Sequence, residues 1–395
     1  MSVTFPHGFQ AAGVVAGLKP SGLPDLAMLV GDPGTTAAGL FTTNRVVAAP
    51  VTLSRARLAG GRARAVVVNS GQANAATGAA GESAAHATTD AAAAVAALAP
   101  EELLQCSTGV IGEPLHLDVM LAALPALVAA LSPEGGEDFA RAIMTTDTVP
   151  KTVAIETASG LRVGGAAKGV GMISPNLATM LAFLTTDGAA DPHMLQGLAD
   201  DVLKPRFNAF TVDGCTSTND TVLLLASGAA AAAETTDVGE LADALAQAAD
   251  SLVHQLIADG EGATHVLLID VEGAGDDAAA RAVAKAVADS PLVKTAAFGK
   301  DPNPGRILQA VGSSGADVDP GLLDVWIGGA QVAAAGVIPP SYFDAGGDLR
   351  AAATAAMSGP EIAIRVRLGE GPGRSRTFGC DLSYEYVRIN GEYTT

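Results

Sequence analysis

Cysteine and histidine, which proteins use for disulfides and transition-metal sites, are scarce in this chain of 395 residues. The three cysteines, Cys106, Cys215 and Cys380, lie far apart, and no two have the spacing of a metal-ligand pair or a redox pair. The six histidines form no HExxH or similar pair. We therefore expect no metal site and no disulfide framework, and interpret the cysteines as small apolar side chains.

Positive charge is also in short supply, because 23 lysine and arginine residues stand against 42 aspartate and glutamate residues. The resulting net charge of −19 argues against nucleic acid or an anionic membrane as a partner, since both require basic patches. No uncharged apolar stretch is long enough to span a bilayer. The first ten residues, MSVTFPHGFQ, lack the basic and apolar regions of a signal peptide. These features predict a cytoplasmic protein.

Several common catalytic motifs are missing as well. The chain contains neither a G-x-S-x-G serine-hydrolase turn nor a G-x-x-x-x-G-K-[ST] phosphate-binding loop. The stretch GVGMIS at 169–174 begins like a dinucleotide-binding fingerprint but lacks the third glycine. We therefore expect no bound cofactor and look for catalysis in a single activated side chain.

What the chain does have is a regular alternation of strand-like and helix-like segments. Apolar residues make up 49% of the sequence, which predicts a folded protein. β-Branched runs predict strands at 64–71, 221–228, 264–273, 361–369 and 384–389, and alanine-rich runs predict helices at about 82–98, 117–131, 239–258 and 277–289. The alternation indicates layered α/β or α+β units. The stretch 272–290 predicts a boundary between a main domain, 1–275, and a smaller carboxy-terminal α/β domain, 276–395.

One threonine stands in an unusual setting, in the sequence AKGVGMISPNLATMLAFLTTD at 167–187. A threonine hydroxyl is a weak nucleophile without a base, but a free α-amino group on the same residue, with a pKa of about 7.7–8.0, would supply one. Thr179 would gain that amine if the peptide bond after Ala178 were cut. The small Ala178 leaves its carbonyl open to attack, and the Ser-Pro-Asn turn at 174–176 favours a tight bend. From chemistry alone, an ordinary structural threonine remains the alternative.

Eight blocks of sequence, taken in order, carry a resemblance that covers nearly the whole chain. They are NSGQANAATG (69–78), CSTGVIGEPL (106–115), MTTDTVPK (144–151), AKGVGMISPNLATML (167–181), DGCTSTNDTVLLL (213–225), DGEGATH (259–265), SPLVKTAAFGKDPNPGR (290–306) and YVRINGEYTT (386–395). Together they resemble the glutamate/ornithine N-acetyltransferase family of arginine biosynthesis. The block around Thr179 is the most specific of the eight.

The resemblance implies a fold, a maturation step and a reaction. The fold is a layered αββα sandwich of the self-processing aminopeptidase/ornithine acetyltransferase type, with a smaller α/β domain whose tail returns to the active site. Autocatalytic cleavage between Ala178 and Thr179 gives an α chain, 1–178, and a β chain from 179, which associate as an α2β2 heterotetramer. Thr179 takes the acetyl group of N-acetylornithine and passes it to glutamate. Acetyl-CoA is an alternative acetyl donor in some members, which makes those enzymes bifunctional.

The same resemblance assigns the supporting residues. Thr108 and Gly109 match an oxyanion-hole pair, whose donors must point at the developing alkoxide. The substrate-binding positions are Thr145, Lys168, Thr179, Glu261, Asn390 and Thr395.

Each supporting residue also has a plainer interpretation. Lys168 could be a solvated surface lysine, Thr145 a turn or helix-capping hydroxyl, and Glu261 an exposed turn residue. Asn219 and Asp220 are expected to be structural or to support the residues that contact the substrate.

The sequence departs from the family pattern at Ala76, His265 and Pro304, where cysteine, lysine and tryptophan are usual. None of these changes touches the nucleophile or the oxyanion pair, whereas those at Pro304 and His265 could alter local packing or substrate contacts. Two other functions fit parts of the sequence. One is an aminopeptidase or amidase of the same fold, in which water takes the acyl group. The other is a non-catalytic binding protein, which the intact blocks around Thr108 and Thr179 disfavour.

Overall fold

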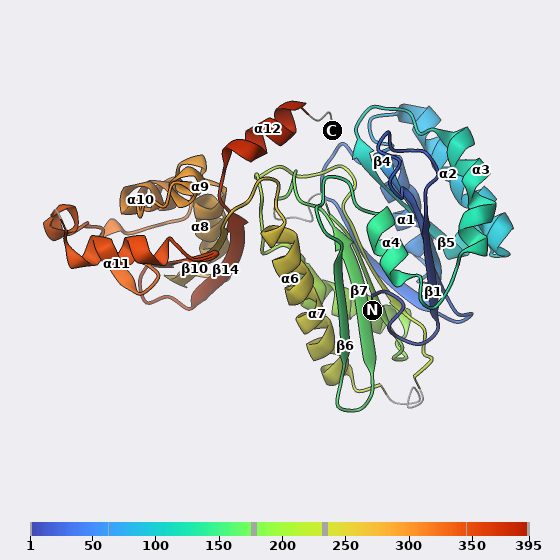
Figure 1. Cartoon of the computed structure of the whole chain (residues 1–395). Helices are drawn as coiled ribbons and strands as arrows, with labels where there is room; N and C mark the ends of the chain where they lie inside the picture. Colours follow the sequence, from blue (N-terminus) through green and yellow to red (C-terminus); the bar gives the residue numbers. More distant parts are fainter. Residues whose placement is uncertain (1, 62, 175–179, 231–235, 345, 393–395) are drawn as a thin grey trace. The chain divides into compact units, whose positions relative to one another are not determined.

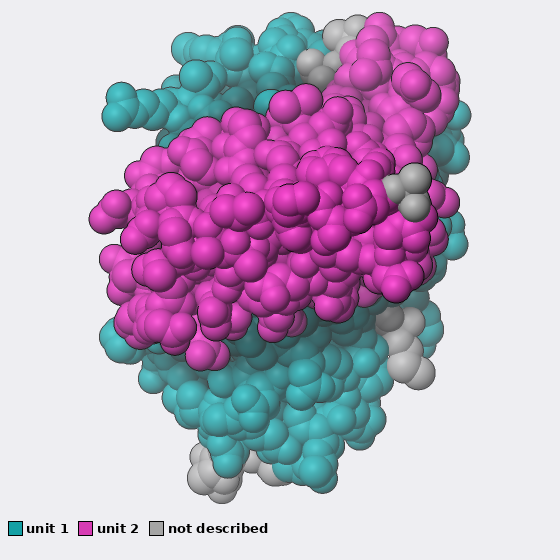
Figure 2. Space-filling view, turned by 90° about the vertical axis from the view of Figure 1, so that its left-hand side faces the viewer, with its two compact units in different colours: residues 1–208, 215–256, 394–395 teal, residues 209–214, 257–393 magenta. Residues whose placement is uncertain are grey.

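The computed structural model describes residues 2–61, 63–174, 180–230, 236–344 and 346–392 (Figure 1). It contains two compact units, which Figure 2 distinguishes by colour. The larger unit is formed by residues up to 208 together with 215–256, and the smaller unit by 209–214 and most residues from 257 onward. No helix in the described part of the chain is both long and apolar enough to cross a membrane.

The larger unit contains two sheets. In the four-stranded sheet the strand order is β1 (Phe9–Val14), β2 (Leu26–Gly31), β4 (Ala65–Gln72) and β5 (Leu103–Val110). In the five-stranded sheet the order is β3 (Thr36–Phe41), β9 (Thr221–Ala226), β8 (Leu181–Thr186), β7 (Arg162–Lys168) and β6 (Lys151–Glu156). The helices are α1 (Ala49–Leu58), α2 (Gly78–Ala96), α3 (Leu117–Ala129), α4 (Gly136–Ala142), α5 (Pro192–Leu198), the π-helical η2 (Ala199–Leu203), α6 (Lys204–Phe207) and α7 (Val238–Ala258).

The two sheets pack face to face and helices cover their outer faces, which gives the predicted αββα order (Figure 1). One apolar cluster joins the sheets, with Val66 and Val68 of β4 against Phe183 of β8 and Leu223 of β9. A second cluster packs β4 and β5 against α2 and α3. Strands β8 and β9 are buried along their whole length, as expected for a parallel pair covered on both faces.

The smaller unit is built on a five-stranded sheet in the order β12 (Ala330–Ala333), β11 (Asp324–Ile327), β13 (Glu361–Arg367), β10 (Val266–Ala274) and β14 (Gly373–Cys380). Its helices are α8 (Asp277–Asp289), α9 (Pro291–Phe298), α10 (Pro304–Gly312), α11 (Asp348–Ala356) and α12 (Tyr384–Glu392). Strand β10 pairs with β13 and β14 over its length. The predicted boundary at 275/276 falls directly after this strand.

Four of the five predicted strands and all four predicted helices are confirmed within a few residues, as β4, β9, β10 and β13 and as α2, α3, α7 and α8. The prediction of a strand at 384–389 is wrong, because this segment lies in α12. The Ser383 hydroxyl accepts the Glu385 N–H at the start of this helix, as a helix cap does. Arg388 then pairs with Glu385 and Glu392, one turn away on either side.

Candidate active site

The predicted oxyanion pair lies at the end of β5, in the larger unit. β5 runs parallel to β4, with Thr108 beside Ser70 and Gly109 beside Gly71. Gly109 has a φ of +131°, a backbone conformation that side chains rarely adopt. A Cβ atom at this position would lie 2.2 Å from the carbonyl carbon of Gly71. The close approach of the two strands therefore requires glycine here.

Lys168, the last residue of β7, joins two of the other predicted site residues. Its ammonium donates to the Thr145 hydroxyl at 2.7 Å and to the Thr108 hydroxyl at 3.1 Å. Lys168 is only 3% exposed, so the surface-lysine alternative is wrong. Because the Thr108 oxygen accepts from Lys168, its own hydroxyl proton points elsewhere, and no acceptor for it is found among the described residues. Such a proton can stabilise a developing oxyanion.

A buried aspartate that the sequence analysis did not single out supports this cluster. Asp147 accepts the Lys151 ammonium at 2.6 Å and the Gly169 N–H at 2.9 Å, and its second oxygen accepts the Thr145 N–H at 3.0 Å. Burial alone would raise the pKa of the Asp147 carboxyl, but the charges of Lys168 and Lys151 and these hydrogen bonds outweigh it and hold the pKa below its usual value. Asp147 therefore stays ionised and fixes both Thr145 and the residue after Lys168.

The proposed cleavage site, Ala178–Thr179, lies outside the described residues. Met180, the next residue in the chain, donates its N–H to the Asp220 carboxylate at 3.0 Å, and Leu181 pairs with Lys168 across β7 and β8. Burial raises the pKa of Asp220 well above its usual value, although the Met180 N–H, the Ser217 and Thr42 hydroxyls and Lys168 oppose this effect.

The neighbouring Asn219 anchors the other side of the cluster. Its amide donates to the carbonyl oxygens of Ala73, at 2.6 Å, and Ser107, at 2.9 Å. Ser107 directly precedes Thr108 in β5. Residues 219 and 220 therefore hold two parts of the site. Asn219 holds β5, the strand that carries the predicted oxyanion residues, and Asp220 holds Met180, the residue that follows Thr179. These contacts are the structural role expected of the two residues.

Two further predicted residues meet in the smaller unit. Asn390 of α12 donates its side-chain N–H to the Glu261 carboxylate at 2.8 Å. Glu261 is 7% exposed, so its interpretation as an exposed turn residue is wrong. Thr395 lies outside the described residues.

Two of the departures from the family pattern also lie in the smaller unit. His265 is buried, and its ring nitrogen Nδ1 lies 3.2 Å from the Asp381 carboxylate. Pro304 occupies the first turn of α10 behind the capping Asn303, a position that suits proline.

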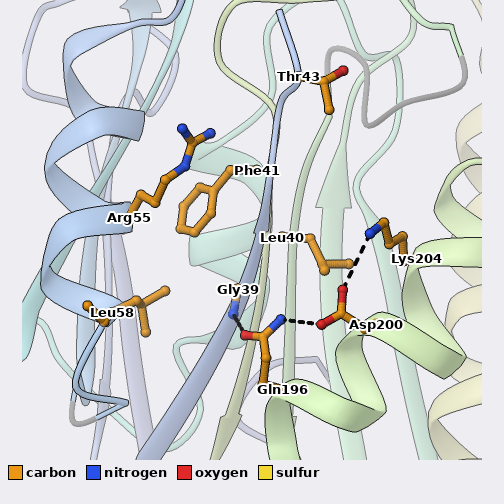
Figure 3. A pocket seen from close by; sticks show the side chains of 10 residues that line it. Gly39, Leu40, Phe41, Thr43, Arg55, Leu58, Gln196, Asp200 and Lys204 are labelled. Atoms are coloured by element: carbon orange, nitrogen blue, oxygen red, sulfur yellow. Dashed lines mark hydrogen bonds and ion pairs between the residues drawn. The ribbon is translucent and has the colours of Figure 1, made fainter.

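A pocket of about 380 Å³ opens beside β3 in the larger unit, and none of the predicted site residues lines it (Figure 3). Three of its polar side chains bind one another: Gln196 donates to Asp200 at 3.0 Å, and Lys204 lies 3.5 Å from the same carboxylate. We therefore interpret this pocket as an ordinary hollow of the protein surface. No group of three or more metal-ligating side chains occurs in the part of the chain that the structure describes.

We expect Gly109→Ala to slow the transfer reaction that the family resemblance implies by about 10²–10³-fold, the cost of misplacing one oxyanion donor. The added methyl group would meet the Gly71 backbone at 2.2 Å, so the end of β5 must shift. Steady-state measurement of kcat checks this. Gly112→Ala is the matched control, because Gly112 also has a positive φ, +86°, but nothing lies within 4 Å of its Cβ position. Equal rates for both variants would remove Gly109 from the site.

Comparison with known proteins gives a matching family, two similar relatives and a similar solved structure. A sequence model of the ArgJ family matches residues 10–395. The arginine biosynthesis bifunctional protein ArgJ of Thermosynechococcus vestitus is 46% identical over 411 residues, covering 100% of this chain and 98% of the relative. The protein of the same name from Parasynechococcus marenigrum is 47% identical over 398 residues, covering 100% and 95%. The crystal structure of ornithine acetyltransferase complexed with ornithine from Mycobacterium tuberculosis is 47% identical, with a TM-score of 0.44, and covers 44% of this chain and 94% of that chain.

Proposed function

Because the chain belongs to the ArgJ family, we propose that it is the acetyltransferase of arginine biosynthesis that moves the acetyl group of N-acetylornithine to glutamate through Thr179. The observation that carries the proposal is the buried bridge from Lys168 to the hydroxyls of Thr108 and Thr145. This bridge places a cation and a hydroxyl donor at the end of β7. There β7 pairs with Leu181, which comes two residues after Thr179 in the sequence.

Maturation comes first in this proposal. The Thr179 hydroxyl oxygen attacks the carbonyl carbon of Ala178, the peptide C–N bond breaks, and the acyl group moves to oxygen as an ester. Water then hydrolyses the ester, which leaves a carboxylate on Ala178 and a free α-amine on Thr179. Asp220 accepts the Met180 N–H and so holds the residue that follows the new terminus in the sequence.

Acetyl transfer then runs in two half-reactions. The Thr179 oxygen attacks the acetyl carbonyl of N-acetylornithine, its proton passes to the α-amine of Thr179, and this amine protonates the departing nitrogen of ornithine. The α-amine of glutamate next attacks the acetyl ester and forms N-acetylglutamate as the C–O bond to Thr179 breaks; the α-amine of Thr179 takes the proton from the attacking nitrogen and returns it to the Thr179 oxygen. Both tetrahedral intermediates carry an oxyanion, which the Thr108 hydroxyl and the Gly109 N–H stabilise.

Several finer features belong to the same proposal. The enzyme needs no bound cofactor, and acetyl-CoA serves as a second acetyl donor, as the word bifunctional in the names of the relatives suggests. The mature chains form an α2β2 assembly in the cytoplasm. Glu261, Asn390 and Thr395 contact the substrate, with the Glu261 carboxylate suited to the cationic side chain of ornithine.

The test compares three reactions of the purified protein: N-acetylornithine with glutamate, acetyl-CoA with glutamate, and N-acetylornithine alone. We expect N-acetylglutamate and ornithine in equal amounts from the first, and little acetate from the third. Acetate release without transfer would replace the proposal by an amidase. Denaturing electrophoresis of the same sample should show two bands of roughly 18 and 21 kDa, scaled by length from 39.2 kDa.

A further inference from the structure

Lys19 is a lysine near the site that none of the roles above uses, and its loop is unusually well fixed. It lies between β1 and β2. The buried Asp25 carboxylate accepts the four successive backbone N–H groups of residues 16–19 at 2.5–3.1 Å. The Leu18 carbonyl also accepts the side chain of Gln72, a residue of β4. The backbone that carries Lys19 is therefore held rigidly against the four-stranded sheet.

The ammonium of Lys19 is partly buried but has no anionic partner among the described residues. It donates to the carbonyl oxygens of Pro24 at 2.8 Å and Met144 at 2.6 Å. An ammonium has three N–H donors, and no acceptor for the third occurs in the described part of the chain. Burial lowers the pKa of Lys19 to about 8. The carboxylates of Asp25 and Asp147 oppose this effect, and the positive charge of Lys168 adds to it. A cation in such a place gains most from binding an anion.

One of the carbonyls that hold Lys19 is next to the predicted site. Met144 directly precedes Thr145, whose hydroxyl accepts from Lys168. The nearby carboxylates are already engaged: Asp25 by four backbone N–H groups, and Asp147 by Lys151 and two further N–H groups. Lys19, Lys151 and Lys168 together carry one more charge than Asp25 and Asp147, and burial raises the pKa of the remaining nearby carboxyl, Asp220, well above its usual value. In a chain with a net charge of −19, this local excess of positive charge is suited to one incoming carboxylate.

We propose that the ammonium of Lys19 binds the α-carboxylate that the acetyl donor and the acetyl acceptor have in common. This inference rests on the proposed function. N-acetylornithine and glutamate differ in their side chains, but each has a carboxylate on the carbon that bears the reacting nitrogen. A single fixed cation can therefore place that nitrogen against the nucleophile in both half-reactions. Lys19 is then a specificity residue for α-amino acids.

The test removes the lysine charge and the substrate carboxylate separately and together. Transfer from N-acetylornithine is measured with glutamate and with 4-aminobutyrate, which is glutamate without its α-carboxylate, in the wild type and in Lys19→Gln. We expect Lys19→Gln to lower kcat/KM for glutamate roughly tenfold to a hundredfold. The kcat/KM for 4-aminobutyrate should stay nearly unchanged, because this acceptor has no α-carboxylate to bind. Equal losses with both acceptors would show that Lys19 only holds the loop to Met144, and would overturn the proposal.

Two controls separate this result from other failures. Both chains must appear on denaturing gels of Lys19→Gln, and Lys204→Gln, at an exposed ion pair with Asp200, should behave as the wild type. A wild type that makes no N-acetylglutamate would instead refute the proposed function itself.

The pH dependence gives a second measurement that does not require loss of activity. Because the pKa of Lys19 is about 8, the wild-type KM for N-acetylornithine should rise above about pH 8, where the ammonium loses its proton. The reacting nitrogen of this substrate is acylated and does not titrate. Lys19→Arg stays charged, so this rise should move beyond pH 9.5. If KM still rises near pH 8 in Lys19→Arg, another group causes the rise, and the proposal is contradicted.

Discussion

Thr179→Ala is expected to yield one uncut chain of 39.2 kDa with no acetyl transfer above background, a loss on the order of 10⁶-fold. The same hydroxyl oxygen attacks the Ala178 carbonyl in maturation and the acetyl carbonyl in transfer, so both steps need it. Denaturing electrophoresis measures the first step, and an assay for N-acetylglutamate measures the second.

Thr179→Ser is the matched control, because serine keeps the hydroxyl and, once cut, the α-amine. We expect it to be cleaved, although more slowly, and to retain part of the transfer rate. A Thr179→Ala protein that is cut but inactive would show that another group performs the cleavage. A cut and active one would remove Thr179 from the mechanism altogether. Met180 and Leu181 are anchored through Asp220 and Lys168, so neither substitution should disturb the strand that follows.

Most of the fold could be predicted from the sequence because its strands and helices are long and strongly patterned. Strand β13 shows why: Ile362, Ile364 and Val366 are buried and their neighbours are exposed, in the strict alternation of a strand. The segment at 384–389 shows the limit. Its tyrosines, valine and isoleucine have high strand propensity. However, Tyr384 and Val387 are 83% and 66% exposed, so these side chains do not pack in a sheet. The cap at Ser383 and the ion pairs of Arg388 stabilise a helix instead.

The site was only partly predictable for a different reason. Thr108, Thr145 and Lys168 were named from the family blocks, and the structure brings them together by hydrogen bonds. Asp147 and Lys19 carry no local signature of their roles. Asp147 reads as a turn residue in TTDT, and Lys19 as an exposed charge next to proline. Their importance comes from contacts with residues more than 20 positions away, such as Gly169 and Met144, and only the packed structure supplies these.

Asp147→Asn is expected to lower the free energy of unfolding by about 3–5 kcal/mol, the cost of leaving a buried charge without its partner. The side chains of Asp147 and Lys151 are both completely buried, and the Lys151 ammonium lies 2.6 Å from the carboxylate. Removing the negative charge breaks the ion pair with Lys151 and weakens the hold on the backbone N–H groups of Thr145 and Gly169. Denaturant unfolding in the Thr179→Ala background measures the loss, since an uncut chain avoids dissociation of two fragments.

Asp200→Asn is the control for this measurement, because Asp200 is 44% exposed and lies 3.5 Å from Lys204. Exposed pairs of this kind contribute about 0–1 kcal/mol, so the control should unfold nearly as the parent does. Adding Lys151→Met to Asp147→Asn should recover part of the loss, since the buried lysine charge that lost this ion pair is then gone. No recovery would show that Asp147 stabilises the unit through its backbone hydrogen bonds and not through the ion pair.

The pH dependence of the same variant follows from the lowered pKa of Asp147. An unfolded aspartate has a pKa of about 3.9, so the stability due to this carboxylate is complete above that pH. It is lost as the pH falls through the lower pKa of the folded protein. The gap in unfolding free energy between the parent and Asp147→Asn should therefore be constant from pH 7 to about pH 5 and shrink below about pH 4. A gap that stayed constant down to pH 2 would mean that ionisation of Asp147 contributes nothing to the fold.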